Sequence, residues 1–115
     1  MSFETKRIYD DPSDADGIRI LVDRLWPRGI SKEKAQLAEW CRDLAPSDEL
    51  RKEFHKNTER WEEFCEAYAA ELEGMSEEIE RIREMGRSRT VTLLYALKNE
   101  EHNNAVALKQ YLEQD

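Results

Sequence analysis

Glycine, histidine and cysteine are scarce in this chain of 115 residues, which contains four, two and two of them. So few glycines, none of them clustered, exclude a glycine-rich phosphate loop. The two cysteines, Cys41 and Cys65, match neither a CxxC motif nor a metal-ligand spacing, and two histidines add too little for a structural zinc site. We therefore predict no metal and no cofactor, and free thiols in a reducing, cytoplasmic compartment.

The chain also lacks long apolar runs and any excess of positive charge. No stretch approaches the roughly 20 apolar residues of a membrane helix, and the N-terminal MSFETKRIYD has no apolar core of the secretory type. With a net charge of −8, a broad positive face for duplex nucleic acid is not expected. The same charge disfavours a basic groove that tracks a single strand. A small positive pocket inside a negative surface remains possible, and the oligomeric state is left open.

Three short segments have strand character: Thr5 to Tyr9, Ile18 to Val22 and Thr90 to Leu97. The second and third, IRILV and TVTLLYAL, are almost continuously apolar, which is typical of strands buried on both faces. Helices on either side of a parallel sheet provide such burial. We therefore predict one α/β domain over residues 1–115, a small Rossmann-like three-layer fold with a short, mostly parallel sheet flanked by helices.

Helical spacing of apolar residues dominates the segment between the last two strands. The polar connection DDPSDADG is too short for a helical crossover and predicts a hairpin or an irregular link. The expected helices run from Ser31 to about Leu44, from Ser47 onward, from Trp61 to Leu72 with Gly74 ending it, from Ser76 to Met85 with Gly86 closing it, and from Asn99 onward.

Polar and basic residues follow two of the expected strands. The segment Asp23 to Gly29 (DRLWPRG) follows one, and Lys98 to Asn104 (KNEEHNN) follows the other and opens a helix. The carboxyl ends of parallel strands meet at one edge of a sheet, where ligands bind in open α/β folds. Arg24, Arg28 and Lys98 could there hold a phosphate or carboxylate, close to the free N–H groups of a helix N-terminus.

Structural roles are the alternatives for these residues. Arg24 could pair with a surface acid, which contributes about 1 kcal/mol or less when exposed. Trp26 could either cover the end of the core or form a flat wall for a ring. The hydroxyl of Tyr95, near the end of its strand, could point into the same crevice. Asn99 is most simply a helix cap.

The chain resembles the YeaO-like branch of domain-of-unknown-function family 488. The similarity rests on KRIYD, RILVDRLWPRGISK, PSDELRKEF, RWEEFCEAYAAEL and TLLYALKNEEHNNAVAL, in that order and over nearly the whole chain. It implies a small α/β domain with a Rossmann-like layered sheet, and no settled activity. It favours as ligand-binding positions those that match the family pattern: Arg24, Trp26, Arg28, Arg51, Tyr95, Lys98 and Asn103.

One position departs from the family pattern. The family typically has Asn-His-Ala where this chain has Asn103, Asn104 and Ala105. A histidine there would be the natural acid–base group, whereas an amide does not titrate. His102 does not replace it, because residues 102 and 104 lie about 200° apart on a helix. The substitution disfavours catalysis through an imidazole and leaves binding through cations intact.

Two functions are compatible with these residues. The first is binding of an anionic small molecule at the carboxyl ends of strands 18–23 and 90–97. The alternative is a hydrolase or transferase acting on a nucleotide or nucleic acid in the same crevice, with Asp23, Arg24 and Lys98 as the catalytic candidates. An enzyme should place an unpaired, partly desolvated carboxylate beside the cations. A binding protein should have every nearby acid committed to a partner.

Overall fold

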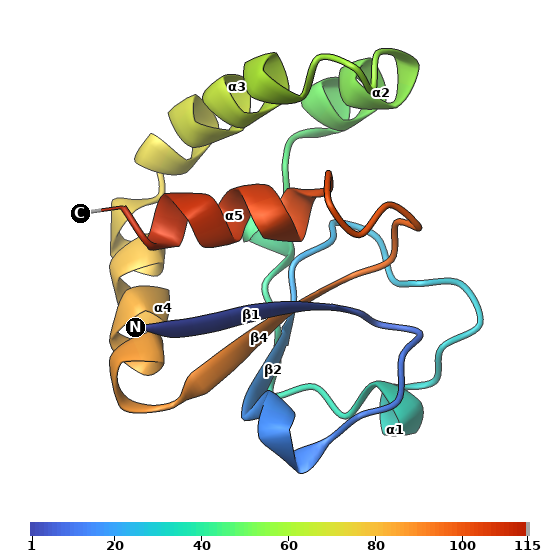
Figure 1. Ribbon diagram of the computed structural model, residues 1–115, viewed down its shortest axis with the longest axis vertical. Coiled ribbons are helices and arrows are strands. Elements are labelled where there is room, and N and C mark those ends of the chain that lie inside the picture. Colours follow the sequence, from blue (N-terminus) through green and yellow to red (C-terminus); the bar gives the residue numbers. More distant parts are fainter. Residues whose placement is uncertain (115) are drawn as a thin grey trace.

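A parallel four-stranded sheet forms the centre of the molecule (Figure 1). The computed structural model describes residues 1–114. The sheet order is β1-β4-β2-β3, and every pairing is parallel, with Ile20 opposite Leu93 and Phe3 opposite Val91. The strands are β1 (Ser2–Arg7), β2 (Ile18–Leu21), β3 (Glu39–Trp40) and β4 (Thr90–Tyr95). The predicted α/β class is therefore confirmed.

Most of the helical mass lies on one face of this sheet. Helices α4 and α5 contact β1 and β4, and α3 packs on the far side of α5 (Figure 1). No helix among residues 1–114 is both long enough and apolar enough to cross a membrane. The helices are α1 (Lys32–Ala35), α2 (Asp48–Lys56), α3 (Trp61–Glu73), α4 (Ser76–Ser88) and α5 (Asn104–Leu112), with 3-10 turns at Asp14–Asp16 and Arg42–Leu44.

Both faces of the sheet are buried, as the apolar runs predict. Alternate strand residues point to opposite faces. Ile20 and Leu93 join the larger core beneath the helices, whereas Leu21 and Leu94 join a smaller core with Ile8, Ile30 and Ala35. The smaller core is covered by the single turn of α1 and the loop around it. The expected helical layer on this second face is thus reduced to one turn.

The prediction of a helix from Ser31 to Leu44 is wrong. The helix α1 ends at Ala35, and Gln36 adopts a left-handed conformation with φ of 46°. The buried guanidinium of Arg19 donates two hydrogen bonds to the Ala35 carbonyl, which fixes this end. The chain then pairs with β2, and the Cys41 N–H donates to the Leu21 carbonyl. Residues whose apolar spacing is helical therefore form strand β3 instead of a helix.

Two further predicted boundaries are corrected. The helix α5 begins at Asn104 with Asn103 as its cap, because Asn99 forms a local turn and accepts from the N–H groups of Glu101 and His102. Gly86 lies inside α4 and does not end it. A Cβ at Gly86 would come within 2.6 Å of the Phe3 ring, so the glycine admits this ring against the helix.

The connection between β1 and β2 is irregular, not a hairpin, since β4 lies between these strands. It contains the 3-10 turn Asp14–Asp16, capped by Ser13. Gly17 follows with φ of +65°, and a Cβ there would lie 2.2 Å from the Thr90 carbonyl oxygen. Only glycine allows the chain to pass this close to β4.

Candidate functional site

A pocket of about 270 Å³ lies beyond the carboxyl ends of β2 and β4. The segment after β2 forms one wall, the residues after β4 a second, and Arg51, Phe54 and His55 of α2 a third. This is the edge of the sheet at which strand-end reasoning predicts a ligand site. The lining residues are Asp23, Arg24, Leu25, Trp26, Pro27, Arg28, Ala45, Pro46, Arg51, Phe54, His55, Phe64, Ala96, Leu97 and Asn104.

Arg24 is held rigidly at this pocket. Its Nε donates to the Pro46 carbonyl and one terminal nitrogen donates to the Ala45 carbonyl, each at 3.3 Å. Carbonyl groups do not neutralise a guanidinium, and Arg24 forms no ion pair within residues 1–114. Its positive charge is therefore retained at the pocket in a fixed position.

Arg51 supplies a second and less constrained cation. It lies in the first turns of α2, which Ser47 caps by accepting from the Leu50 N–H. Its only ion pair among the described residues is with Asp48, at 3.5 Å and largely solvated. The Nε of Arg51 is buried and has no hydrogen-bond partner. If this side chain turned toward a bound ligand, no hydrogen bond at Nε would be broken.

Arg28 lies at the exposed rim of the pocket. The loop that carries it is fixed through its backbone, since the Tyr9 hydroxyl donates to the Arg28 carbonyl at 2.8 Å. No side-chain hydrogen bond or ion pair of Arg28 occurs within residues 1–114. The pocket thus combines one guanidinium group held by two carbonyl groups and two guanidinium groups with few side-chain partners.

Phe54 and Phe64 form an apolar wall of the pocket. Both are buried, and their ring centroids are 4.5 Å apart. Trp26 also lines the cavity, but its indole N–H donates to the Ile30 carbonyl and its ring packs edge-on against Trp40. Trp26 therefore packs in the smaller core and also lines the pocket. The two alternatives left open by its sequence position, a cover for the core and a wall of the crevice, both apply.

Each oxygen of the Asp23 carboxylate accepts one hydrogen bond from an amide group. Asn104 Nδ2 donates to Oδ1 at 3.0 Å, and the Ala96 N–H donates to Oδ2 at 3.0 Å. Asn104 Nδ2 also donates to the Val22 carbonyl. Burial raises the pKa of Asp23, while these two hydrogen bonds and the charge of Arg51 oppose that rise. The carboxylate thus ties the ends of β2 and β4 to the start of α5.

Three residues predicted to bind the ligand lie outside the lining of this pocket. Tyr95 is buried in the larger core, and Lys98 is exposed on the loop before α5. Asn103 is fully buried, with Oδ1 accepting from the Val106 N–H and Nδ2 donating to the Asn99 carbonyl. The cause is the late start of α5, which makes Asn103 a cap and leaves Lys98 in a loop.

Phe54, His55, Phe64 and the bonding role of Asn104 are not evident from the sequence. Phe64 has the spacing of a core residue, and the pocket reaches it only because α3 folds over the strand ends. His55 lies near the end of α2 and has no hydrogen bond or ion pair among the described residues. Asn104 was notable only as a departure from the family pattern, and nothing in its sequence context indicates the bond to Asp23.

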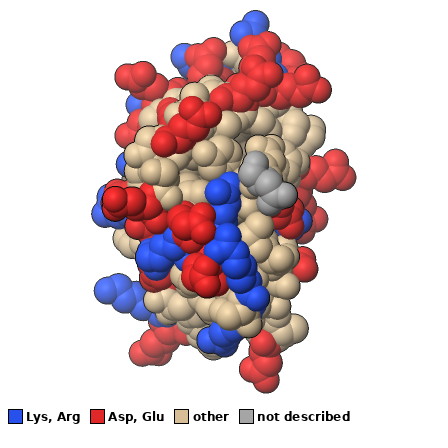
Figure 2. Space-filling view, turned by 90° about the vertical axis from the view of Figure 1, so that its left-hand side faces the viewer, with Lys and Arg blue, Asp and Glu red and all other residues tan. Residues whose placement is uncertain are grey.

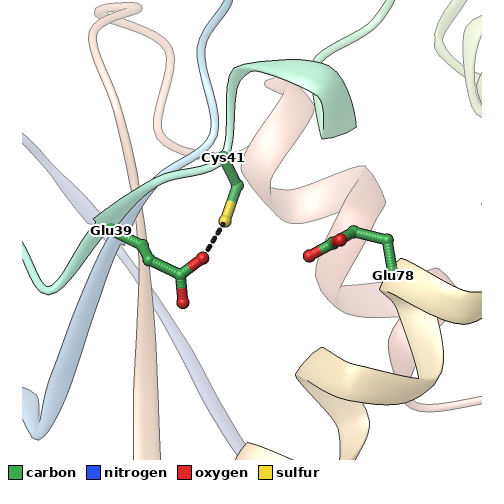
Figure 3. Close-up of side chains that lie close together, drawn as sticks. All are labelled: Glu39, Cys41 and Glu78. Carbon is green, nitrogen blue, oxygen red and sulfur yellow. Dashed lines mark hydrogen bonds between the residues drawn. The ribbon is translucent and has the colours of Figure 1, made fainter.

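A second polar cluster lies away from the pocket, where β3 meets α4. Ligand atoms of Glu39, Cys41 and Glu78 lie within 4.8 Å of one another (Figure 3). Arg81 forms ion pairs with both carboxylates, so a guanidinium already neutralises them. Burial and the neighbouring carboxylate of Glu39 raise the pKa of the Cys41 thiol to about 12. This cluster is an ion-pair network with an inert thiol.

Ion pairs also cover the surface around this cluster. Figure 2 shows acidic and basic side chains side by side on the face that carries α4. There Arg87 pairs with Glu80 and Glu84, and Arg83 pairs with Glu80. Exposed pairs of this kind contribute about 1 kcal/mol or less each. These cations are paired with acids, whereas Arg24 and Arg28 at the pocket have no acidic partner among the described residues.

The fold and pocket define a small α/β domain with a ligand-sized cavity at the carboxyl ends of its parallel strands. The chain belongs to the family described as the inactive DUF488-N3 subclade, whose model matches residues 2–115. The resemblance to domain-of-unknown-function family 488 is thereby confirmed.

Similar proteins occur in distant bacteria. Uncharacterized protein YeaO of Escherichia coli K12 is 44% identical over 112 residues, which cover 97% of each chain. Uncharacterized protein Rv3073c of Mycobacterium tuberculosis H37Rv is 41% identical over 106 residues, 92% of this chain and 89% of the relative. Uncharacterized protein Mb3100c of Mycobacterium bovis matches to the same extent. No solved structure matches the chain.

Proposed function

We propose that the protein binds an anionic small molecule in the pocket at the ends of β2 and β4, without chemical turnover. The observation that carries this proposal is the composition of the lining. Three arginines, Arg24, Arg28 and Arg51, line one cavity, and the single carboxylate in that lining, Asp23, accepts a hydrogen bond from an amide on each oxygen. A guanidinium presents paired donors that suit a carboxylate or phosphate.

The absence of turnover follows from the groups that could move a proton. Asp23 would have to break its bonds to Asn104 or Ala96 to act as a base. His55 lines the pocket, yet an acid–base imidazole needs a partner that orients it, and none occurs within residues 1–114. The family description as an inactive subclade supports the same conclusion. The hydrolase or transferase alternative is not favoured by any contact in this pocket.

A small anion suits the charge distribution better than a nucleic acid does. The chain carries a net charge of −8, and the ion-paired face over α4 offers no continuous basic surface. Arg24 and Arg28, neither of which has an acidic partner among the described residues, both line a pocket of about 270 Å³. A local positive potential in such a cavity attracts small anions, whereas the negative remainder of the surface repels a polyanion. The two free cysteines suit a reducing, cytoplasmic compartment.

Thermal unfolding in the presence of a panel of carboxylates, sugar phosphates, nucleotides and inorganic phosphate tests the proposal. A ligand at about 100 times its Kd adds roughly 2.7 kcal/mol to the free energy of unfolding. For a domain of this size that corresponds to a rise in Tm on the order of 10 °C. We expect such a rise for at least one anion, and we expect it to be largely lost in Arg51→Gln.

Arg87→Gln is the matched control, because it removes the same charge from the ion-paired face of α4. It should retain the ligand-induced rise in Tm. If no anion in the panel raises Tm, or if Arg51→Gln and Arg87→Gln respond as the wild type does, the pocket is not an anion site and the proposal is overturned.

A further inference from the structure

We infer that the bound anion carries a flat apolar ring, so that the ligand is an aryl carboxylate, an aryl phosphate or a compound of the same design. The inference rests on the proposed function and specifies its ligand class. The observation behind this inference is that one pocket has an apolar wall on one side and cations on another.

The interior of the pocket is apolar. Phe54, Phe64, Leu97 and Pro27 line it, and the indole N–H of Trp26 is already bonded to the Ile30 carbonyl. A small hydrated anion would leave these surfaces in contact with water. A ring placed against Phe54 and Phe64 would remove apolar area from water and could stack on an aromatic face.

The charges impose a direction on such a ligand. Arg24 is already bonded to the Pro46 and Ala45 carbonyls and is not available to turn toward a ligand. Arg51 on α2 and Arg28 on the rim are the cations free to reorient. The anionic group therefore belongs beside Arg28 and Arg51, and the ring belongs against the apolar wall.

The volume limits the size of the ligand. Pockets for drug-sized ligands have volumes of roughly 300–1,000 Å³, and this pocket, at about 270 Å³, is smaller than that range. It can enclose one ring system with its anionic substituent. A dinucleotide cofactor would extend far outside it.

Titration of the protein with three matched probes, followed by backbone amide NMR, tests this inference. The probes are phenyl phosphate, inorganic phosphate and phenol, which carry the ring and the anion together, the anion alone and the ring alone. Burial of a phenyl ring should lower the Kd of phenyl phosphate at least about tenfold below that of inorganic phosphate. The Kd of phenyl phosphate should also be lower than the Kd of phenol. The amide chemical-shift changes should be confined to the residues around the pocket.

Two variants separate the contributions of charge and ring. Arg51→Gln should weaken both phosphate probes about equally and leave phenol binding unchanged. Leu97→Ala removes part of the apolar wall and keeps the backbone carbonyl that accepts from Arg7, and thermal unfolding of the variant checks that it is folded. It should weaken phenyl phosphate and phenol but not inorganic phosphate, whereas Arg87→Gln should change none of the three.

The outcomes distinguish the two proposals. Equal affinities for phenyl phosphate and inorganic phosphate would overturn the aryl inference and leave the anion site in place. Binding of phenol alone, or of no probe, would overturn the proposed function and the inference with it.

Discussion

Replacement of Asn104 by leucine should lower the free energy of unfolding by about 2–4 kcal/mol, because two buried acceptors lose their donor. Asn104 Nδ2 donates both to the Val22 carbonyl and to Asp23 Oδ1, and the residue is 9% exposed. Leucine has a similar volume but no polar group. The Asp23 carboxylate would keep only the Ala96 N–H as a partner, in a site where burial already disfavours its charge.

Urea unfolding of the wild type, Asn104→Leu, Asp23→Ala and the double variant measures this contribution. We expect a coupling free energy of about 1–2 kcal/mol between the two positions, since the leucine should cost less once the carboxylate is gone. An Asn104→Leu variant within about 0.5 kcal/mol of wild type, or additive single effects, would show that the amide is not holding the carboxylate.

Asp16→Ala should destabilise the protein by about 3–5 kcal/mol, the usual cost of removing one partner from a buried ion pair. Asp16 and Arg19 are 8% and 5% exposed, and Arg19 donates to Asp16 Oδ2 at 2.6 Å. Lys6 pairs with the same carboxylate at 3.1 Å. Without Asp16, the buried guanidinium of Arg19 would keep only the Ala35 carbonyl as an acceptor, and its charge would have no acidic partner.

The pH dependence of this effect has a defined sign. Burial raises the pKa of Asp16, but hydrogen bonds from Ser13, Lys6 and Arg19 outweigh this effect, and the pKa in the folded protein lies below the ordinary value of 3.8. A lowered pKa in the folded state contributes stability that is present above the unfolded pKa and is lost as pH falls through the folded pKa. The difference between wild type and Asp16→Ala should therefore be full at neutral pH and shrink as pH falls below about 3.8.

Denaturant unfolding at neutral pH and at about pH 3 checks both the size and the sign. Asp14→Ala is the control, because Asp14 is an exposed acid in the same 3-10 turn. A difference for Asp16→Ala that is the same at both pH values, or no larger than that of Asp14→Ala, would contradict the role of this carboxylate.

The strands could be predicted because their sequences are strongly biased. IRILV and TVTLLYAL are apolar at nearly every position, and β2 and β4 are buried on both faces. The segment after Ser31 could not be predicted, since Leu37, Trp40 and Leu44 have helical spacing. Its outcome depends on Arg19, which lies more than a dozen positions earlier and captures the Ala35 carbonyl. Local spacing contains no information about such a tertiary contact.

The site was predictable to the extent that it depends on strand ends. Arg24, Trp26 and Arg28 follow β2 directly, and strand-end geometry places them at one edge of the sheet. The wall of Phe54 and Phe64 comes from α2 and α3, whose docking depends on packing far along the chain. The late start of α5 was missed because Asn99 and Asn103 are equally good caps by residue type.

Anion binding by Arg28 and Arg51 can be followed at a single atom, the Nε of Arg51. This atom is buried without a partner in the free protein, so its N–H resonance should respond when an anion binds. On titration with phenyl phosphate, we expect a saturable shift of the Arg51 Nε–H signal, with the same Kd as the backbone shifts around the pocket and no change at Arg87. Backbone shifts that saturate while Arg51 is unchanged, or an equal response at Arg87, would contradict it.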